Sequence, residues 1–302
     1  MLKTRIVDVA NTAGAIGGGG AAAGVCGVDA INNKTLSVIT IVGVSISNVF
    51  LVTTLVIICC LENLRNSERY RILRHLVIAL LLANLFFFLL EVDVKNSIAC
   101  SLLAGCLHYS LLAAFSWMLI MSTDVYIKIK YPFADHERRF FYCRYIGWIG
   151  PVTVVGTTVC ITRQNYASDK CWLKNESGAI WAFVSPVCLT LLIVLVQLVV
   201  IGYIAFKKAQ RPNQTGQEME NFKRIRTLFT GILLLTPAVG ISWIFGVILV
   251  FCDWKALHYI YVILNSMQGL FIWLSQCAFS KEVREALIKK FSNQISQENT
   301  TM

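Results

Sequence analysis

The stretch "ILNSMQGLFIWLSQC", residues 263–277, combines the hydrophobicity of a membrane helix with a cluster of polar groups. Asn265, Ser266, Gln268 and Gly269 all lie in its first half. Polar groups are costly in hydrocarbon unless other protein groups receive them. At helical spacing Asn265, Gln268 and Gly269 share one face, which we expect to point into a bundle of helices.

The rest of the chain has the composition of a multi-pass membrane protein. Its 302 residues are 56% hydrophobic and 15% charged, less charge than a soluble domain of this size needs to cover its surface. A helix crosses a bilayer with about 20 apolar residues. Seven such blocks occur, at residues 36–60, 72–91, 99–126, 144–162, 179–206, 226–251 and 257–279. We therefore expect an all-α membrane protein, a seven-transmembrane helix bundle.

The net charge of +10 is spread unevenly over the connections between these blocks. With the N-terminus outside, 19 of the 27 Lys and Arg residues fall in the inner connections and the C-terminal tail. Positive charge marks the cytoplasmic side, so the sequence predicts a multi-pass plasma-membrane protein with its N-terminus outside. This distribution argues against a basic nucleic-acid-binding face. The sequons at Asn33 and Asn175 fall outside, where glycosylation occurs.

The chain divides into three segments. Residues 1–35 are rich in Gly and Ala, show no apolar period, and are predicted to be a flexible extracellular segment. Residues 36–279 form the expected seven-transmembrane domain, and residues 280–302 an amphipathic helix and cytoplasmic tail. Membrane lipids are the expected partner of that helix, because basic residues alternate with one apolar face. The apolar face comprises Phe279, Val283, Ala286, Leu287 and Phe291.

The residues disfavour three other classes of membrane protein. A retinal protein needs a lysine for its Schiff base in the last helix, and residues 257–279 contain none. A secondary transporter usually shows repeated halves around an ion site, and no repeat is visible. The four histidines fall on separate segments without metal-ligand spacing. We therefore expect no catalytic residue, no metal site and no cofactor.

Four of the 11 cysteines fall outside in this topology. Cys100 lies at the outer end of the third block, and Cys171 lies in the loop after the fourth. These two are the natural pair in an oxidising compartment. Cys26 and Cys252 are also outside, and spacing does not determine connectivity. The residues alone therefore leave the pairing open.

Four separated segments carry a family resemblance. They are "LLAGCLHYSLLAAFSWML" (102–119), "CWLKNESGAIWAFVSPV" (171–187), "GISWIFGVI" (240–248) and "NSMQGLFIWLSQCAFSKEVREAL" (265–287). In this order they resemble the seven-helix domain of adhesion G-protein-coupled receptors, over about residues 36–291. Rhodopsin-like receptors are a poorer match, because Val125 stands where their Asp-Arg-Tyr segment has Arg and their Asn-Pro-x-x-Tyr segment is missing.

The resemblance implies a receptor that activates heterotrimeric G proteins when a peptide or tethered-peptide agonist binds, and it implies the Cys100–Cys171 disulfide. The positions matching the agonist pocket are Phe115, Trp117, Trp172, Trp181, Trp243 and Phe245. The positions matching the activation relay are His75, His108, Asn265, Gln268 and Gly269. The expected G-protein contacts are Tyr126, Lys128 and Phe133.

The chain departs from the family pattern in two places. Met121 stands where many members have Glu, so the polar interaction of that Glu is missing or moved to Asp124. The first histidine is His75, so no autoproteolysis motif precedes the first helix, and the residues before that helix lack the Phe/Leu/Met agonist pattern. A non-signalling adhesion or scaffold protein and a secretin-type hormone receptor are the alternative interpretations.

Overall fold

The computed structural model describes residues 33–91, 96–130, 136–168, 171–174, 176–209, 243, 245–246, 248 and 255–301. Within this part, five helices are long and apolar enough to cross a membrane. They are α2 (Asn33–Cys60), α4 (Glu68–Glu91), α5 (Ser97–Lys130), α6 (His136–Thr162) and α7 (Trp181–Ala209). A bent sixth span is built from α10 (Lys255–Ser266), α11 (Gln268–Trp273) and the π-helical turn η3 (Leu274–Ala278).

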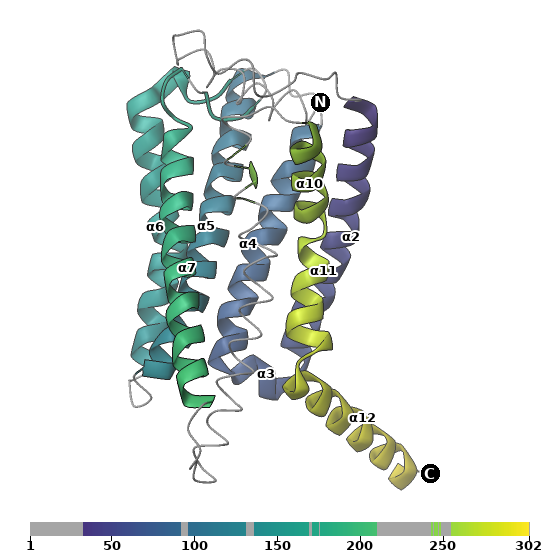
Figure 1. The fold of residues 1–302 in the computed structure, drawn as a ribbon. Coiled ribbons are helices and arrows are strands. Elements are labelled where there is room, and N and C mark those ends of the chain that lie inside the picture. The colour runs from purple at the N-terminus through teal and green to yellow at the C-terminus, as the bar shows by residue number, and fades with distance from the viewer. Residues whose placement is uncertain are drawn as a thin grey trace.

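Three shorter or peripheral elements complete the described chain. The single-turn helix α3 (Glu62–Asn66) connects α2 to α4, and the 3-10 turn η1 (Arg163–Asn165) ends α6. The last helix, α12 (Lys281–Thr301), turns away from the bundle, as Figure 1 shows. Most of the predicted block 226–251 lies outside the described residues.

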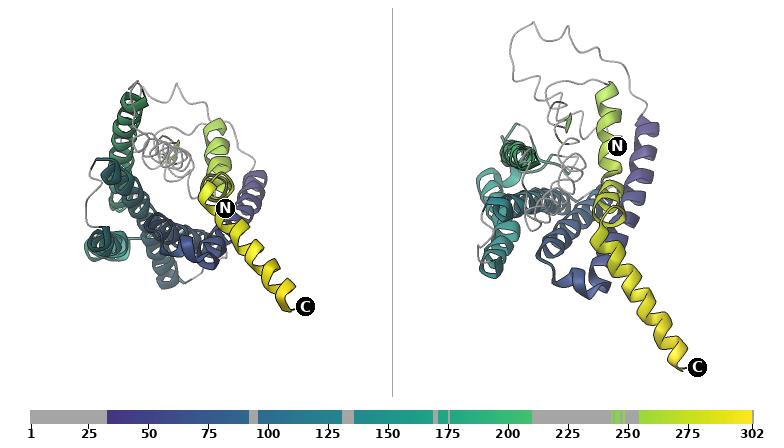
Figure 2. Two further views of the ribbon diagram at one scale, coloured as in Figure 1. Left: turned by 90° about the horizontal axis from the view of Figure 1, so that it is seen from below. Right: turned by 60° about the horizontal axis from the view of Figure 1, so that its bottom comes forward.

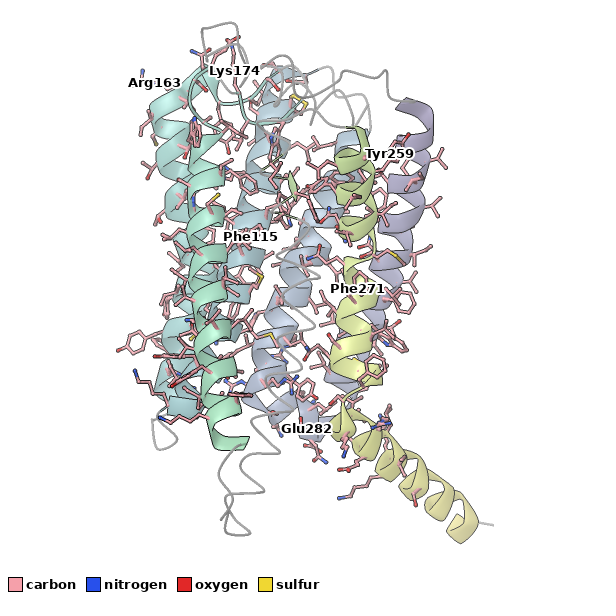
Figure 3. The ribbon with its side chains drawn as sticks, in the orientation of Figure 1. Phe115, Arg163, Lys174, Tyr259, Phe271 and Glu282 are labelled. Atoms are coloured by element: carbon pink, nitrogen blue, oxygen red, sulfur yellow. A yellow bond between two sulfur atoms is a disulfide. The ribbon has the colours of Figure 1, made fainter. Side chains whose placement is uncertain are left out.

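The spans stand side by side, with α5 near the centre of the bundle (Figures 1 and 2). Helix α5 packs against α4, α6 and α7, whereas α2 packs against α4, α10 and α11. Arg163 and Lys174 lie at one end of the bundle and Glu282 at the other (Figure 3). The expectation of an all-α membrane bundle is confirmed.

Burial on α2 shows how a membrane helix distributes its side chains. Leu51 and Ile58 are fully buried in the bundle. Val49, Val52 and Val56, three or four residues apart, are exposed on the opposite side. An apolar outward face suits a lipid environment, where it meets hydrocarbon and not water. The blocks therefore contain apolar residues on both faces.

The predicted block 257–279 is not one straight helix. It breaks at Met267, and its two parts are inclined by 44°. The break coincides with close packing against α2, where Ser266 packs on Gly43 and Gly269 abuts the Ser47 backbone. The Gly269 N–H donates to Ser47 Oγ at 2.8 Å, so one amide near the break bonds across to α2. Small residues permit this close approach of two helices.

The amphipathic pattern predicted for the tail holds in part. Val283 is buried, and Ala286 and Leu287 pack against the bundle core. Phe279 is 67% exposed because it lies in the turn between η3 and α12, before the helix begins. The side chain of Phe291 lies outside the described part.

Candidate functional site

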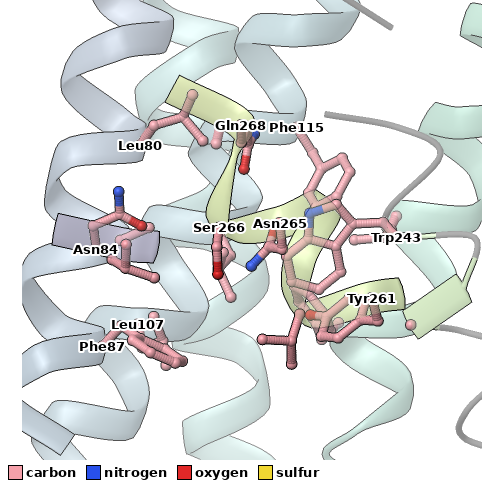
Figure 4. A pocket seen from close by; sticks show the side chains of 18 of the residues that line it. Leu80, Asn84, Phe87, Leu107, Phe115, Trp243, Tyr261, Asn265, Ser266 and Gln268 are labelled. Atoms are coloured by element: carbon pink, nitrogen blue, oxygen red, sulfur yellow. The ribbon is translucent and has the colours of Figure 1, made fainter. Parts of the chain in front are cut away.

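A cavity of about 170 Å³ lies between α2, α4, α5, α7 and α10–α11 (Figure 4). Most of its wall is apolar, with Leu80, Phe87 and Leu107 on one side and Trp243 on the other. Its polar lining residues are Thr40, Asn84, Asn265, Ser266 and Gln268. A concave apolar site with a few convergent polar groups is typical of ligand-binding sites.

Trp243 is the centre of an aromatic cluster in the cavity wall. Its ring meets Phe115 of α5 edge to face at 5.3 Å between centroids. It packs similarly against Phe183 of α7 at 5.6 Å and against Tyr261 of α10 at 6.1 Å. Edge-to-face pairs are a favoured aromatic geometry, so the position of the Trp243 ring depends on three helices together.

Gln268 supplies a buried polar group of the cavity wall. Its side chain is 7% exposed, and its Nε2 has no hydrogen-bond partner in the described part of the chain. Asn84, also in the wall, instead donates to Asn48 Oδ1 at 2.7 Å. A buried donor without a partner is costly, so the Gln268 amide is the wall group with most to gain from a ligand acceptor.

Three of the six predicted pocket residues line this cavity, and three do not. Phe115, Trp172 and Trp243 are in its wall. Trp117, two residues after Phe115, faces α4 and α6, where its ring stacks on His75 at 4.4 Å. Residues two apart on a helix point to nearly opposite sides. Phe115 and Trp117 therefore cannot both line this cavity.

The direction of the side chains also explains why Trp181 and Phe245 lie outside the cavity wall. Trp181, at the start of α7, is 53% exposed, whereas Phe183, two residues later, lines the cavity. Phe245 packs against Leu257, Tyr261 and Val262 and is not in the cavity wall. The sequence prediction did not include Phe183 and Tyr261. The position of Phe183 around the helix relative to Trp181 could have identified it.

The predicted relay residues fall into separate places. Asn265 and Gln268 lie together at the cavity, on either side of the break (Figure 4). Gly269 faces α2 instead. His75 accepts a hydrogen bond from Trp148 Nε1 at 3.3 Å, and no described interaction joins it to Gln268. His108 lies edge to face with Phe183 at 5.8 Å, which connects it to Trp243.

The connection between α6 and α7 is held against the bundle by a disulfide and a buried hydrogen bond. The disulfide joins Cys100 of α5 to Cys171, the pairing that the resemblance implies, while Cys26 and Cys252 lie outside the described residues. Tyr166 is buried and its hydroxyl hydrogen-bonds His108 Nδ1 at 3.0 Å. Burial raises the pKa of the Tyr166 phenol, with a smaller contribution from Cys106. The loop thereby places Trp172 in the cavity wall.

At the other end of the bundle, ion pairs join three helices. Asp124 of α5 binds Lys128 at 2.7 Å and Arg139 of α6 at 2.6 Å. Lys128 also binds Glu68 of α4 at 3.0 Å. The sequence indicated a polar role for Asp124 but none for Glu68 and Arg139, because these two are distant from it in the chain or on another helix.

The remaining predicted positions are less fully described. Tyr126 pairs with Lys130 through its hydroxyl at 3.1 Å. Phe133 and Asn175 lie outside the described residues. Asn33 is the first residue of α2, and the structure does not describe its side chain.

These features define a class: a helical membrane protein with a cavity near the loop end and ion pairs at the opposite end. The family "7 transmembrane receptor (Secretin family)" has a model that matches residues 33–272. The chain therefore belongs to the secretin family of seven-transmembrane receptors. The matched range includes the block 226–251.

Curated relatives agree with this assignment. Human adhesion G protein-coupled receptor L4 is 33% identical over 231 residues, which are 75% of this chain and 33% of the relative. Human adhesion G protein-coupled receptor L1 is 32% identical over 260 residues, 86% of this chain and 17% of that protein. The resemblance to adhesion receptors is thereby confirmed, and the chain spans a third or less of these relatives.

Proposed function

We propose that this chain is a signalling seven-helix domain of the adhesion-receptor type, oriented with its N-terminus outside the plasma membrane. An agonist binds in the cavity, and the change activates a heterotrimeric G protein at the opposite end. The observation that carries the proposal is the packing of Trp243 against three helices, beside the unpartnered Gln268 amide at a helix break.

The cavity indicates the chemistry of the agonist. Its volume of about 170 Å³ suits one or two apolar side chains of a peptide or tethered peptide and not a folded domain. Burying such side chains between aromatic rings supplies the binding energy. A backbone carbonyl of the same peptide can accept from Gln268 Nε2, which removes the cost of the unpaired donor.

The break at Met267 offers a route from the cavity toward the inner end. An element that already has two segments at an angle absorbs a change in Trp243 or Gln268 by altering that angle. Below the break, η3 meets the start of α4, where Arg69 Nη2 donates to Gln276 Oε1 at 2.8 Å. A change of angle at Met267 therefore moves groups next to the inner ion pairs.

At the inner face we propose Tyr126, Lys128 and Phe133 as G-protein contacts. Lys128 is held by Glu68 and Asp124, so engagement of a G protein by Lys128 requires these ion pairs to rearrange. The basic face of α12 is proposed to rest on anionic lipids of the same leaflet.

The test is nucleotide exchange by a panel of purified G proteins with the chain in nanodiscs. Trp243→Ala and Gln268→Ala are compared with Trp181→Ala, a matched change of an exposed tryptophan outside the cavity. We expect exchange above empty discs, a several-fold change in the first two variants, and none in Trp181→Ala. Absence of exchange with every G protein and every candidate peptide would instead favour a non-signalling anchor.

A further inference from the structure

The inner end of α2 carries two adjacent cysteines that the proposed mechanism does not use. Cys59 and Cys60 are both exposed free thiols. They lie three and four residues after Val56 and so continue the outward-facing stripe of Val52 and Val56. Ile58, the residue before them, is fully buried on the other side of the helix. The two thiols therefore face away from the bundle.

The thiols also lie where the apolar part of α2 ends. The membrane-length span ends at Cys60. The connection that follows contains Glu62, Asn63, Arg65 and Asn66, with an exposed ion pair between Glu62 and Arg65 at 3.7 Å. Leu61 and Leu64, the apolar residues of this connection, are buried against the bundle. Cys59 and Cys60 thus stand at the boundary between hydrocarbon and water, facing lipid.

The amphipathic helix is attached at the same point. Lys290 Nζ of α12 donates to the Cys60 carbonyl oxygen at 3.1 Å, and α12 leaves the bundle beside α3 (Figure 1). Residues 279–302 contain no cysteine. A basic helix alone binds a leaflet reversibly, and an acyl chain next to a basic surface gives stable attachment. The thiols next to α12 are therefore placed to supply that second signal.

We propose that Cys59 and Cys60 are a site of reversible S-acylation by long-chain fatty acids. Cysteines next to a membrane boundary are the usual acceptors of this modification. The proposal rests on the proposed orientation, which places both thiols on the cytoplasmic side, where acyl-coenzyme A is the donor. The acyl chain can enter the leaflet beside Val56 without crossing a polar surface.

The reaction is an acyl transfer without oxidation or reduction. A cysteine sulfur attacks the thioester carbonyl carbon of the acyl-coenzyme A, assisted by a membrane acyltransferase. A new sulfur–carbon bond forms, the bond to the coenzyme A sulfur breaks, and the cysteine proton ends on coenzyme A. Hydrolysis of the new thioester restores the thiol and releases the fatty acid, which makes the attachment reversible.

The chain contains a matched control pair. Cys160 of α6 and Cys188 of α7 are also exposed free thiols, but they lie in the part of their helices nearer the 163–174 loop. In the proposed orientation they face the opposite leaflet. Exposure alone would make all four thiols equivalent, so acylation confined to Cys59 and Cys60 would depend on their position.

The test uses the full chain expressed in mammalian cells. Free thiols are blocked, thioesters are cleaved with hydroxylamine, and the released thiols are tagged with a maleimide polymer that shifts the protein on a gel. We expect one or two shifted bands that need hydroxylamine, retained in the Cys160→Ser/Cys188→Ser variant and lost in Cys59→Ser/Cys60→Ser. No such shift in the unaltered chain, or a shift retained in Cys59→Ser/Cys60→Ser, overturns the proposal.

An epitope at the N-terminus separates this inference from the function on which it rests. Staining of intact cells shows that each variant has reached the surface with the proposed orientation. With that staining present, a missing shift refutes acylation alone. An epitope that is stained only after permeabilisation refutes the proposed orientation, and the acylation proposal fails with it.

Discussion

Gly269 lies at a close approach of the last span to α2. A Cβ at this position would meet the Ser47 backbone oxygen and Oγ. The obstacle includes backbone, which cannot move aside as the tip of a flexible side chain does. The small residue is thus required by a neighbouring helix, in keeping with small residues at membrane helix interfaces.

Replacing Gly269 with Ala is therefore expected to destabilise the bundle by about 1–3 kcal/mol through overpacking. The matched control is Gly156→Ala on α6, where a Cβ meets no atom within 4 Å. Gly156→Ala lies inside a helix and gains helix propensity, about 1 kcal/mol, without a steric clash. Thermal unfolding in detergent should show a lower midpoint for Gly269→Ala only. Equal midpoints would show that α2 and α11 can separate without cost.

Tyr166 provides a prediction for the loop end of the bundle. Burial raises its pKa above the usual value, so the folded protein keeps the phenol protonated when an exposed tyrosine would ionise. The contribution of the protonated Tyr166 to the free energy of unfolding is fully present below about pH 10, the ordinary tyrosine pKa. This contribution is lost as the pH rises from there toward the raised pKa. The hydrogen bond to His108 adds about 1 kcal/mol.

Thermal midpoints of the unaltered chain and Tyr166→Phe, measured from pH 7 to pH 11, test this account. We expect the unaltered chain to be more stable at pH 7 and to lose that advantage above pH 10. The phenylalanine variant lacks the ionisable group and so lacks this loss. A difference between the two that stays constant through pH 11 would contradict the account.

At the scale of elements, the sequence predicted the spans of the described part well because hydrophobic length is a local property. The helices nevertheless extend past the apolar blocks: α4 begins at Glu68 and α6 at His136, before blocks 72–91 and 144–162. Backbone hydrogen bonding continues through polar residues outside the membrane. The sequence did not predict the break at Met267, which lies beside contacts to Gly43 and Ser47 of another helix.

The ion pairs at the inner end fix three elements relative to one another. Asp124 is 7% exposed in its side chain and faces two cations. Asp124→Asn removes the carboxylate shared by Lys128 and Arg139 and leaves Lys128 paired with Glu68. It is expected to cost about 3 kcal/mol. Glu62→Gln, which removes the exposed pair with Arg65, is the control and should cost about 0.5 kcal/mol or less. Similar midpoints for both variants would mean that the cluster does not hold the helices.

At the scale of the whole molecule, the cavity and the inner ion pairs share one helix. Phe115 in the cavity wall and Asp124 in the cluster are both on α5, about 13 Å apart along its axis at 1.5 Å per residue. The sequence analysis identified residues at both the cavity and the inner end. It assigned pocket residues by residue type and not by their position around the helix, so it included Trp117. The set of residues that lines one cavity depends on how several helices pack together.

If one two-state equilibrium connects the two ends, changes at either end act on the same populations. Asp124→Asn breaks ion pairs that hold the inner ends of the helices together. It should therefore raise basal nucleotide exchange several-fold. Ala114→Leu adds bulk inside the cavity, whose wall includes Ala114, and should raise the thermal stability by about 1 kcal/mol. By restricting Trp243 and Gln268, it should also lower the exchange.

The double variant Ala114→Leu/Asp124→Asn therefore decides whether the ends communicate. With one equilibrium, free-energy effects add, and filling the cavity should reverse much of the exchange gained by Asp124→Asn. Leu102→Phe, on the exposed face of the same helix, is the control and should leave that gain intact. Suppose the filled cavity stabilises the double variant, yet the variant still exchanges nucleotide as fast as Asp124→Asn alone. The cavity and the inner ion pairs would then be independent, because a change that stabilises one state of a shared two-state equilibrium must alter the exchange rate.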